Sequence, residues 1–133
     1  METFISFNRF LSNELQGLDC NDDTRAYIIG VFDQFRRPTF DFSMEPLGVL
    51  YAEAKNTQSF QKFSNIGDWL FIANALFPEH LNAASEDYYY TIGQMSYWSC
   101  YKLLNRQWKL YQELSDRFPE LTEQARELLV YSI

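Results

Sequence analysis

Apolar residues recur every three or four positions through most of this chain, which is the spacing of one face of an α-helix. The pattern is longest from Ser85 to Phe118, where no proline interrupts it. We therefore predict one long helix, or two nearly collinear helices, over residues 85–118. We take this segment as the core of the fold.

Projected on a helical wheel, the segment divides into two unlike faces. The polar residues fall within about a third of the circumference, so we expect them to face solvent. The opposite residues are apolar or small, as in a helix buried against several partners. The polar face comprises Asp87, Thr91, Gln94, Lys102, Asn105, Arg106, Lys109, Gln112, Glu113 and Asp116. The apolar face comprises Tyr89, Gly93, Ser96, Cys100, Leu103, Leu104, Tyr111, Leu114 and Phe118.

Shorter stretches of the same periodicity predict the remaining helices. Acidic and amide side chains at Asp19–Asp23 are suited to cap the start of the second helix. Phe-Pro-Glu occurs at 77–79 and again at 118–120, and each proline favours the first turn of a new helix. Residues 37–46 predict an ordered loop. Three of the other predicted helices cover residues 3–16, 60–77 and 119–131. Another carries Tyr27 to Phe35 and ends before Pro38, and a further one opens at Pro46.

The composition is that of one folded helical domain. Apolar residues make up 47% of the 133 residues and aromatic residues 18%, which excludes intrinsic disorder because ample apolar surface is available to bury. Four prolines and five glycines leave few breaks in the helices. The sequence thus predicts an all-α fold: a single-domain bundle of roughly five or six helices over residues 1–133, arranged around residues 85–118.

Charge and hydropathy restrict the partners and the location. Eighteen acids against eleven bases give a net charge of −7, which argues against a nucleic-acid partner, since phosphate binding needs a basic face. The longest apolar run, Trp69 to Phe77, is far short of the roughly 20 residues of a membrane span. The N-terminus shows no signal-peptide pattern, and Cys20 and Cys100 suggest no disulfide framework. We therefore expect a cytoplasmic protein that binds neither nucleic acid nor membrane.

Several short motifs in the C-terminal half form a recognisable series. They are Gly67-Asp68, Leu70-Phe71, Phe77-Pro78-Glu79, Tyr88-Tyr89 with Gly93 and Tyr97, Glu113-Leu114 and Arg117-Phe118. The series resembles a family of small bacterial helical proteins. The family pattern has a glycine shortly before the Phe-Pro, where this chain has Ala75, and a small residue before the tyrosine at 97, where it has Ser96. The resemblance implies a helical fold and a bacterial cytoplasm, and it brings no catalytic role with it.

No set of residues predicts a catalytic, cofactor or metal site. Asp19–Asp23 begins like a calcium loop, but Thr24 stands where the loop needs glycine and Gly30 where it needs a bidentate glutamate. His80 is the only histidine and has no partners at metal-ligand spacing. Cys100 as a nucleophile, with His80 as base and Asp68 as orienting acid, conflicts with its place on the apolar face. An enzyme of unfamiliar chemistry using Asp68, His80 or tyrosines stays the least favoured class.

Trp98 is the residue whose position needs an explanation, because it falls in the middle of the predicted polar face. Either residues 37–46 cover it, or it contacts a partner protein, since tryptophan and methionine are favoured in interface cores. We therefore predict a non-enzymatic interaction protein that self-associates, as a homodimer or larger homo-oligomer, or docks a partner. The predicted interface residues are Trp98, Met95, Gln94, Tyr101 and Lys102.

A small-ligand binder or sensor is the alternative function. Small residues such as Gly93 on the buried face suit close helix crossing, and they also suit the wall of a pocket for an apolar molecule. That pocket would lie between the helices at 60–77 and 85–118. Its predicted lining residues are Tyr89, Gly93, Tyr111 and Phe71. A second aromatic strip along the flank, formed by Tyr90, Tyr97, Tyr101 and Trp108, is expected to pack against the fold.

Overall fold

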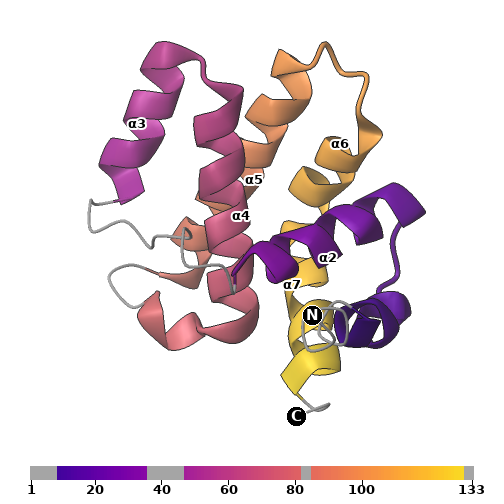
Figure 1. Cartoon of the computed structure of the whole chain (residues 1–133). Helices are drawn as coiled ribbons and strands as arrows, with labels where there is room; N and C mark the ends of the chain where they lie inside the picture. Colours follow the sequence, from indigo (N-terminus) through magenta and orange to yellow (C-terminus); the bar gives the residue numbers. More distant parts are fainter. Residues whose placement is uncertain (1–8, 36–46, 82–84, 131–133) are drawn as a thin grey trace.

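The computed structural model describes residues 9–35, 47–81 and 85–130, and every regular element in these ranges is helical (Figure 1). The predicted all-α fold is confirmed. No helix in the described part of the chain has the length and apolarity to cross a membrane. Residues 9–14 are helical and continue into η1 (Leu15–Gly17). The later elements are α2 (Asp22–Phe35), α3 (Leu47–Thr57), α4 (Phe60–Leu76), η2 (Pro78–His80), α5 (Glu86–Leu103), α6 (Lys109–Asp116) and α7 (Phe118–Val130).

The prediction of one long helix, or of two nearly collinear helices, over residues 85–118 is wrong, because the chain breaks after Leu103 and reverses. Asn105 and Arg106 both have positive φ angles, 58° and 59°. The amide of Arg106 donates to the carbonyl of Tyr101 at 2.9 Å, and the amide of Asn105 donates to that of Lys102 at 3.0 Å. This pair of bonds is a Schellman motif, in which asparagine takes the left-handed position that glycine usually holds. Helix α5 therefore ends without a proline or a glycine.

Helix α6 runs back along α5. Ser115 Oγ donates to the carbonyl oxygen of Gln94 at 2.8 Å, and Lys109 Nζ donates to Tyr101 Oη at 3.1 Å. Later residues of α6 thus meet earlier residues of α5, which is antiparallel pairing (Figure 1). The two helices form a hairpin rather than a rod.

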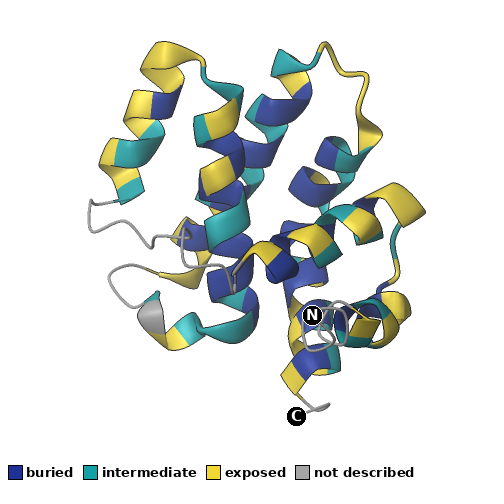
Figure 2. Cartoon of the chain, in the orientation of Figure 1, coloured by how far each residue is buried: buried dark blue, intermediate teal, exposed yellow. Residues whose placement is uncertain are grey.

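Helix α4 lies at the centre of the bundle. It packs against α2, α3, α5 and α7, and most of its residues from Phe63 to Ala75 are buried (Figure 2). Its start is capped by Ser59, whose hydroxyl accepts from the amide of Lys62. The predicted helix at 60–77 is therefore confirmed, but α4 takes the central place that the sequence suggested for 85–118.

Aromatic rings fill the crossings where α5 meets its neighbours. A Cβ atom added at Gly93 would lie 2.4 Å from Cζ of Phe118, and one added at Gly67 would lie 2.7 Å from Cε1 of Tyr97. Real Cβ contacts are never so short, so both positions need the absence of a side chain. The small residues of the predicted apolar face serve close packing of rings.

The remaining helix predictions agree with the structure where it describes them. Helix α2 ends at Phe35, before Pro38, α3 begins just after Pro46, and α7 begins at the second Phe-Pro-Glu. The predicted loop at 37–46 lies outside the described residues, as does the first part of the predicted helix 3–16.

Candidate functional site

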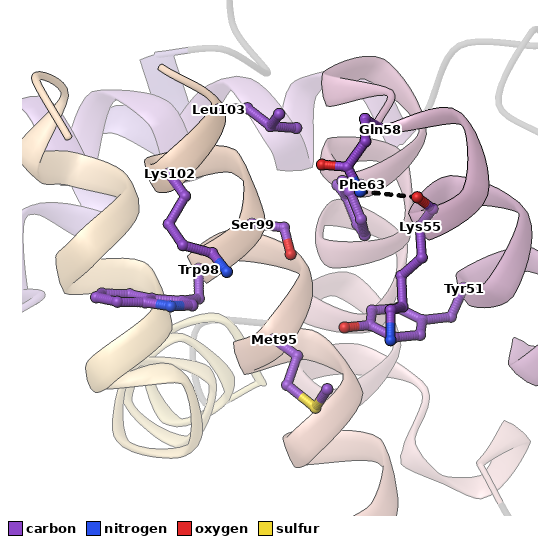
Figure 3. Close-up of a pocket in the computed structure, with 9 residues that line it drawn as sticks. All are labelled: Tyr51, Lys55, Gln58, Phe63, Met95, Trp98, Ser99, Lys102 and Leu103. Atoms are coloured by element: carbon purple, nitrogen blue, oxygen red, sulfur yellow. Dashed lines mark hydrogen bonds between the residues drawn. The ribbon is translucent and has the colours of Figure 1, made fainter. Parts of the chain in front are cut away.

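A half-open groove lies between α3 and α5, with α4 as its floor (Figure 3). Its volume is about 510 Å³, within the range of about 300–1,000 Å³ that is typical of ligand sites. Helices α3 and α5 both pack on α4. The groove is lined by Tyr51, Lys55, Gln58, Phe63, Met95, Trp98, Ser99, Lys102 and Leu103.

Two helix ends of the same type border the groove. Helix α3 ends with the amide of Ser59 bonded to the carbonyl of Ala54 and with Gln58 at a φ of 49°. Helix α5 ends in the same way at Asn105. Both corners lie at the same end of the molecule, the top of Figure 1. Each corner uses a polar residue in the left-handed conformation, so each exposes a side chain that glycine would lack.

Three of the five predicted interface residues line this groove. Trp98 is half-buried, Met95 is 40% exposed at the rim, and Lys102 is exposed (Figure 3). Tyr101 is buried and supports the indole of Trp98 from behind, with ring centroids 5.3 Å apart. The backbone carbonyl of Gln94 is bonded to Ser115, so Gln94 belongs to the contact between α5 and α6.

Residues 37–46, which the sequence offered as a cover for Trp98, lie outside the described residues. Within the described residues, Trp98 packs on Tyr101 and the guanidinium of Arg106 lies 5.8 Å from its ring centre. A cation held over the face of an indole is attracted by the ring quadrupole. Trp98 therefore sits in a positively charged setting.

The four predicted pocket residues lie in the packed seam, which we define as the contact of α5 with α4, α6 and α7, and not in the groove. The ring of Phe118 lies on Gly93, and Phe71 makes an edge contact with Phe118 at 5.7 Å between ring centroids. Tyr111 packs on Phe60 at 5.6 Å, and Tyr89 is buried. Protein side chains account for this packing without a ligand.

Asp68 of α4 is a polar group inside a cluster of tyrosines. Its Oδ1 accepts hydrogen bonds from the hydroxyls of Tyr27 and Tyr97, each at 2.8 Å. Burial raises the pKa of Asp68 to about 6, although the two hydrogen bonds lower it. Burial also raises the pKa of the Cys100 thiol to about 12, and the nearby charge of Asp68 adds to this. A thiol with such a pKa is protonated at neutral pH and is a poor nucleophile.

The Asp19–Asp23 segment is held by arginines. Arg117 Nη1 donates to the carbonyl of Asp19 at 2.6 Å, and Arg25 Nη2 donates to the carbonyls of Leu18 and Cys20 at 2.9 and 3.1 Å. The positive charge of these guanidinium groups opposes a cation at the same oxygens. The segment anchors the N-terminal part of the chain on α6 and α7. The side chain of His80 lies outside the described part of the structure.

Sequence reasoning missed the α3 side of the groove and the position of Trp108. Tyr51 and Lys55 gave no functional signal in the sequence. Trp108 was assigned to a packed aromatic strip, yet it is 57% exposed, because the corner after α5 places it ahead of α6. Tyr97 and Tyr101 of the same strip are buried as expected.

Compared with models of known protein families, with curated proteins and with solved structures, the chain gives no match. The resemblance to small bacterial helical proteins therefore remains a prediction from the sequence motifs, and the groove has to be interpreted from its own chemistry.

Proposed function

We propose that this chain is a non-enzymatic interaction protein that docks a segment of a partner protein in the groove between α3 and α5. The observation that carries the proposal is that half-buried Trp98 and exposed Met95 both line an unfilled hollow at the surface (Figure 3). Tryptophan is the residue most enriched among interface hot spots, and methionine adapts to partners of varied shape.

The shape of the groove favours a protein segment over a small molecule. Small-molecule sites bury about 70–90% of their ligand, whereas this groove is open along one side. A polypeptide can place one or two side chains between Tyr51, Phe63 and Trp98 and leave its backbone at the rim. The cytoplasmic location expected from the sequence is part of the proposal.

Photo-cross-linking tests the proposal directly. A photoreactive amino acid at position 95, on the rim of the groove, should yield a cross-linked adduct in an extract of the source cells. The same residue at the exposed position 127 of α7 serves as the control. We expect the adduct at position 95 to disappear when Trp98→Ala is added, because truncation of a hot-spot tryptophan costs about 2 kcal/mol or more. An adduct at position 95 that is unaffected by Trp98→Ala contradicts the proposal.

A further inference from the structure

The groove is basic although the protein as a whole is acidic. Lys55 approaches it from α3 and Lys102 from α5 (Figure 3). The guanidinium of Arg106 lies over the indole of Trp98. Among the described residues, no carboxylate forms an ion pair with any of these three cations. By contrast, Lys62 is paired with Glu53 and Arg117 with Glu113 and Glu120. Lys55, Lys102 and Arg106 are therefore available to pair with the acidic groups of a partner.

The two stretches that supply most of the groove lining are also free of acids, although Glu53 lies between Tyr51 and Lys55 on α3 and pairs with Lys62. Residues 54–67 and 88–112 contain Lys55, Lys62, Lys102, Arg106 and Lys109, and all eighteen acids of the chain lie elsewhere. These two stretches supply eight of the nine residues that line the groove, all but Tyr51. Among the described residues, no acidic side chain lines the groove, so its positive potential is not neutralised from within these walls.

We propose that the groove selects an acidic protein segment carrying at least one large apolar side chain. The carboxylates of that segment pair with Lys55, Lys102 and Arg106 at the rim, while the apolar side chain enters the space between Tyr51, Phe63 and Trp98. Charge complementarity gives such contacts their selectivity and raises the association rate. This inference rests on the proposed function, and it adds the chemical class of the partner.

Charge also argues against a second copy of the chain at this groove. A two-fold dimer places the same surface on both subunits in contact with itself. Lys55, Lys102 and Arg106 of one subunit would then face the same three cations of the other. Like charges in an interface are unfavourable by several kcal/mol. A separate acidic partner satisfies these groups, whereas an isologous partner does not.

A random-peptide display library tests both claims at once. The library is selected on the full wild-type chain, and each enriched peptide is then measured for binding to Trp98→Ala by fluorescence anisotropy. We expect enriched peptides to be rich in Asp and Glu around an aromatic or leucine anchor, and to bind Trp98→Ala at least about tenfold more weakly. Replacement of their Asp and Glu by Asn and Gln should weaken binding by at least about tenfold.

Two variants of equal charge change provide the matched control. Lys102→Glu places an acid in the groove, whereas Arg126→Glu makes the same change on the exposed face of α7. We expect Lys102→Glu to weaken binding of the selected acidic peptides by more than about tenfold and Arg126→Glu to leave it within about twofold. Circular dichroism of both variants checks that the fold is kept.

The possible outcomes separate the inference from the function on which it rests. Enriched peptides that depend on Trp98 but are neutral or basic overturn the acidic partner and leave the docking function standing. A library with no Trp98-dependent peptide overturns both. A stable dimer in sedimentation that Trp98→Ala dissociates shows that a second copy is the occupant, and also overturns the acidic partner.

Discussion

The two sides of α5 differ in how completely side chains fill the space beside the helix. On the side facing α6 and α7, the ring of Phe118 lies so close to Gly93 that a single added carbon would collide with it. On the side facing α3, Met95, Trp98 and Lys102 border a hollow of about 510 Å³. The same helix thus stabilises the fold with one face and offers the other to a partner. Changes on the first face should affect folding, and changes on the second should affect binding.

The largest difference should appear when one aromatic residue is truncated on each side. Phe71 is 1% exposed, so Phe71→Ala should lower the free energy of unfolding by about 3–5 kcal/mol. Trp98 is half-buried beside an unfilled space, and Trp98→Ala should cost only about 1 kcal/mol. Urea denaturation of both variants provides the comparison, and equal losses would show that Trp98 belongs to the core.

The packed seam can be tested with two glycines. Gly93→Ala forces a Cβ to within 2.4 Å of Phe118 and should destabilise the fold by about 2–3 kcal/mol through overpacking. Gly30 in α2 has no atom within 4 Å of an added Cβ, so Gly30→Ala is the control. It should stabilise the protein by about 0.5–1 kcal/mol, because alanine has the higher helix propensity. Thermal unfolding of the pair checks this, and a Gly93→Ala variant as stable as the wild type contradicts the tight crossing.

Asp68 gives the seam a dependence on pH that the groove should lack. Its folded pKa of about 6 lies above the ordinary 3.8, so the folded state keeps a proton that the unfolded chain releases. The resulting stabilisation is complete below about pH 4 and is lost as the pH rises to about 6. The difference in unfolding free energy between the wild type and Asp68→Asn should fall by about 2 kcal/mol across this window.

Denaturation curves of both proteins at several pH values between 4 and 7 measure that difference. Arg126→Glu, on the exposed face of α7, supplies a profile for an unrelated charge change. If the wild type and Asp68→Asn give parallel profiles, the Asp68 carboxyl is not buried as described.

The smallest expected effect lies at the corner of α3. Gln58 has a φ of 49°, a conformation that glycine adopts without strain. Gln58→Gly should raise the free energy of unfolding by about 0.5–1 kcal/mol and remove one side chain from the groove wall. Thermal unfolding measures the gain, with Gln61→Gly in the regular helix α4 as a control that should destabilise. A loss of stability for Gln58→Gly would argue against the helix end described at this position.

The helical periodicity of the sequence was enough to predict the fold class and most helices. It failed between Leu103 and Lys109, because helix ends are predicted from glycine and proline and this one uses Asn105 and Arg106 instead. An asparagine followed by polar residues carries only a weak stop signal. The failure matters, because the reversal there makes α4 the centre of the bundle and exposes Trp108.

The candidate site could be predicted only in part. Trp98 was found because an indole departs from the pattern of the solvated face, and Met95 and Lys102 were found as its neighbours on the same face. Tyr51 and Lys55 depend on how α3 sits against α4, which no local pattern encodes. One usable signal was overlooked: the acid-free stretch 88–112, whose cations were interpreted as an ordinary solvated face.

The central claim is that Trp98 lies in an accessible and positively charged groove of an acidic protein. A variant with Trp69→Phe and Trp108→Phe leaves Trp98 as the single tryptophan, and its fluorescence can be quenched separately with iodide and with caesium ions. We predict stronger quenching by the anion, in spite of the net charge of −7, and loss of that preference in Lys102→Glu. Stronger quenching by caesium, or no quenching by either ion, would contradict the account.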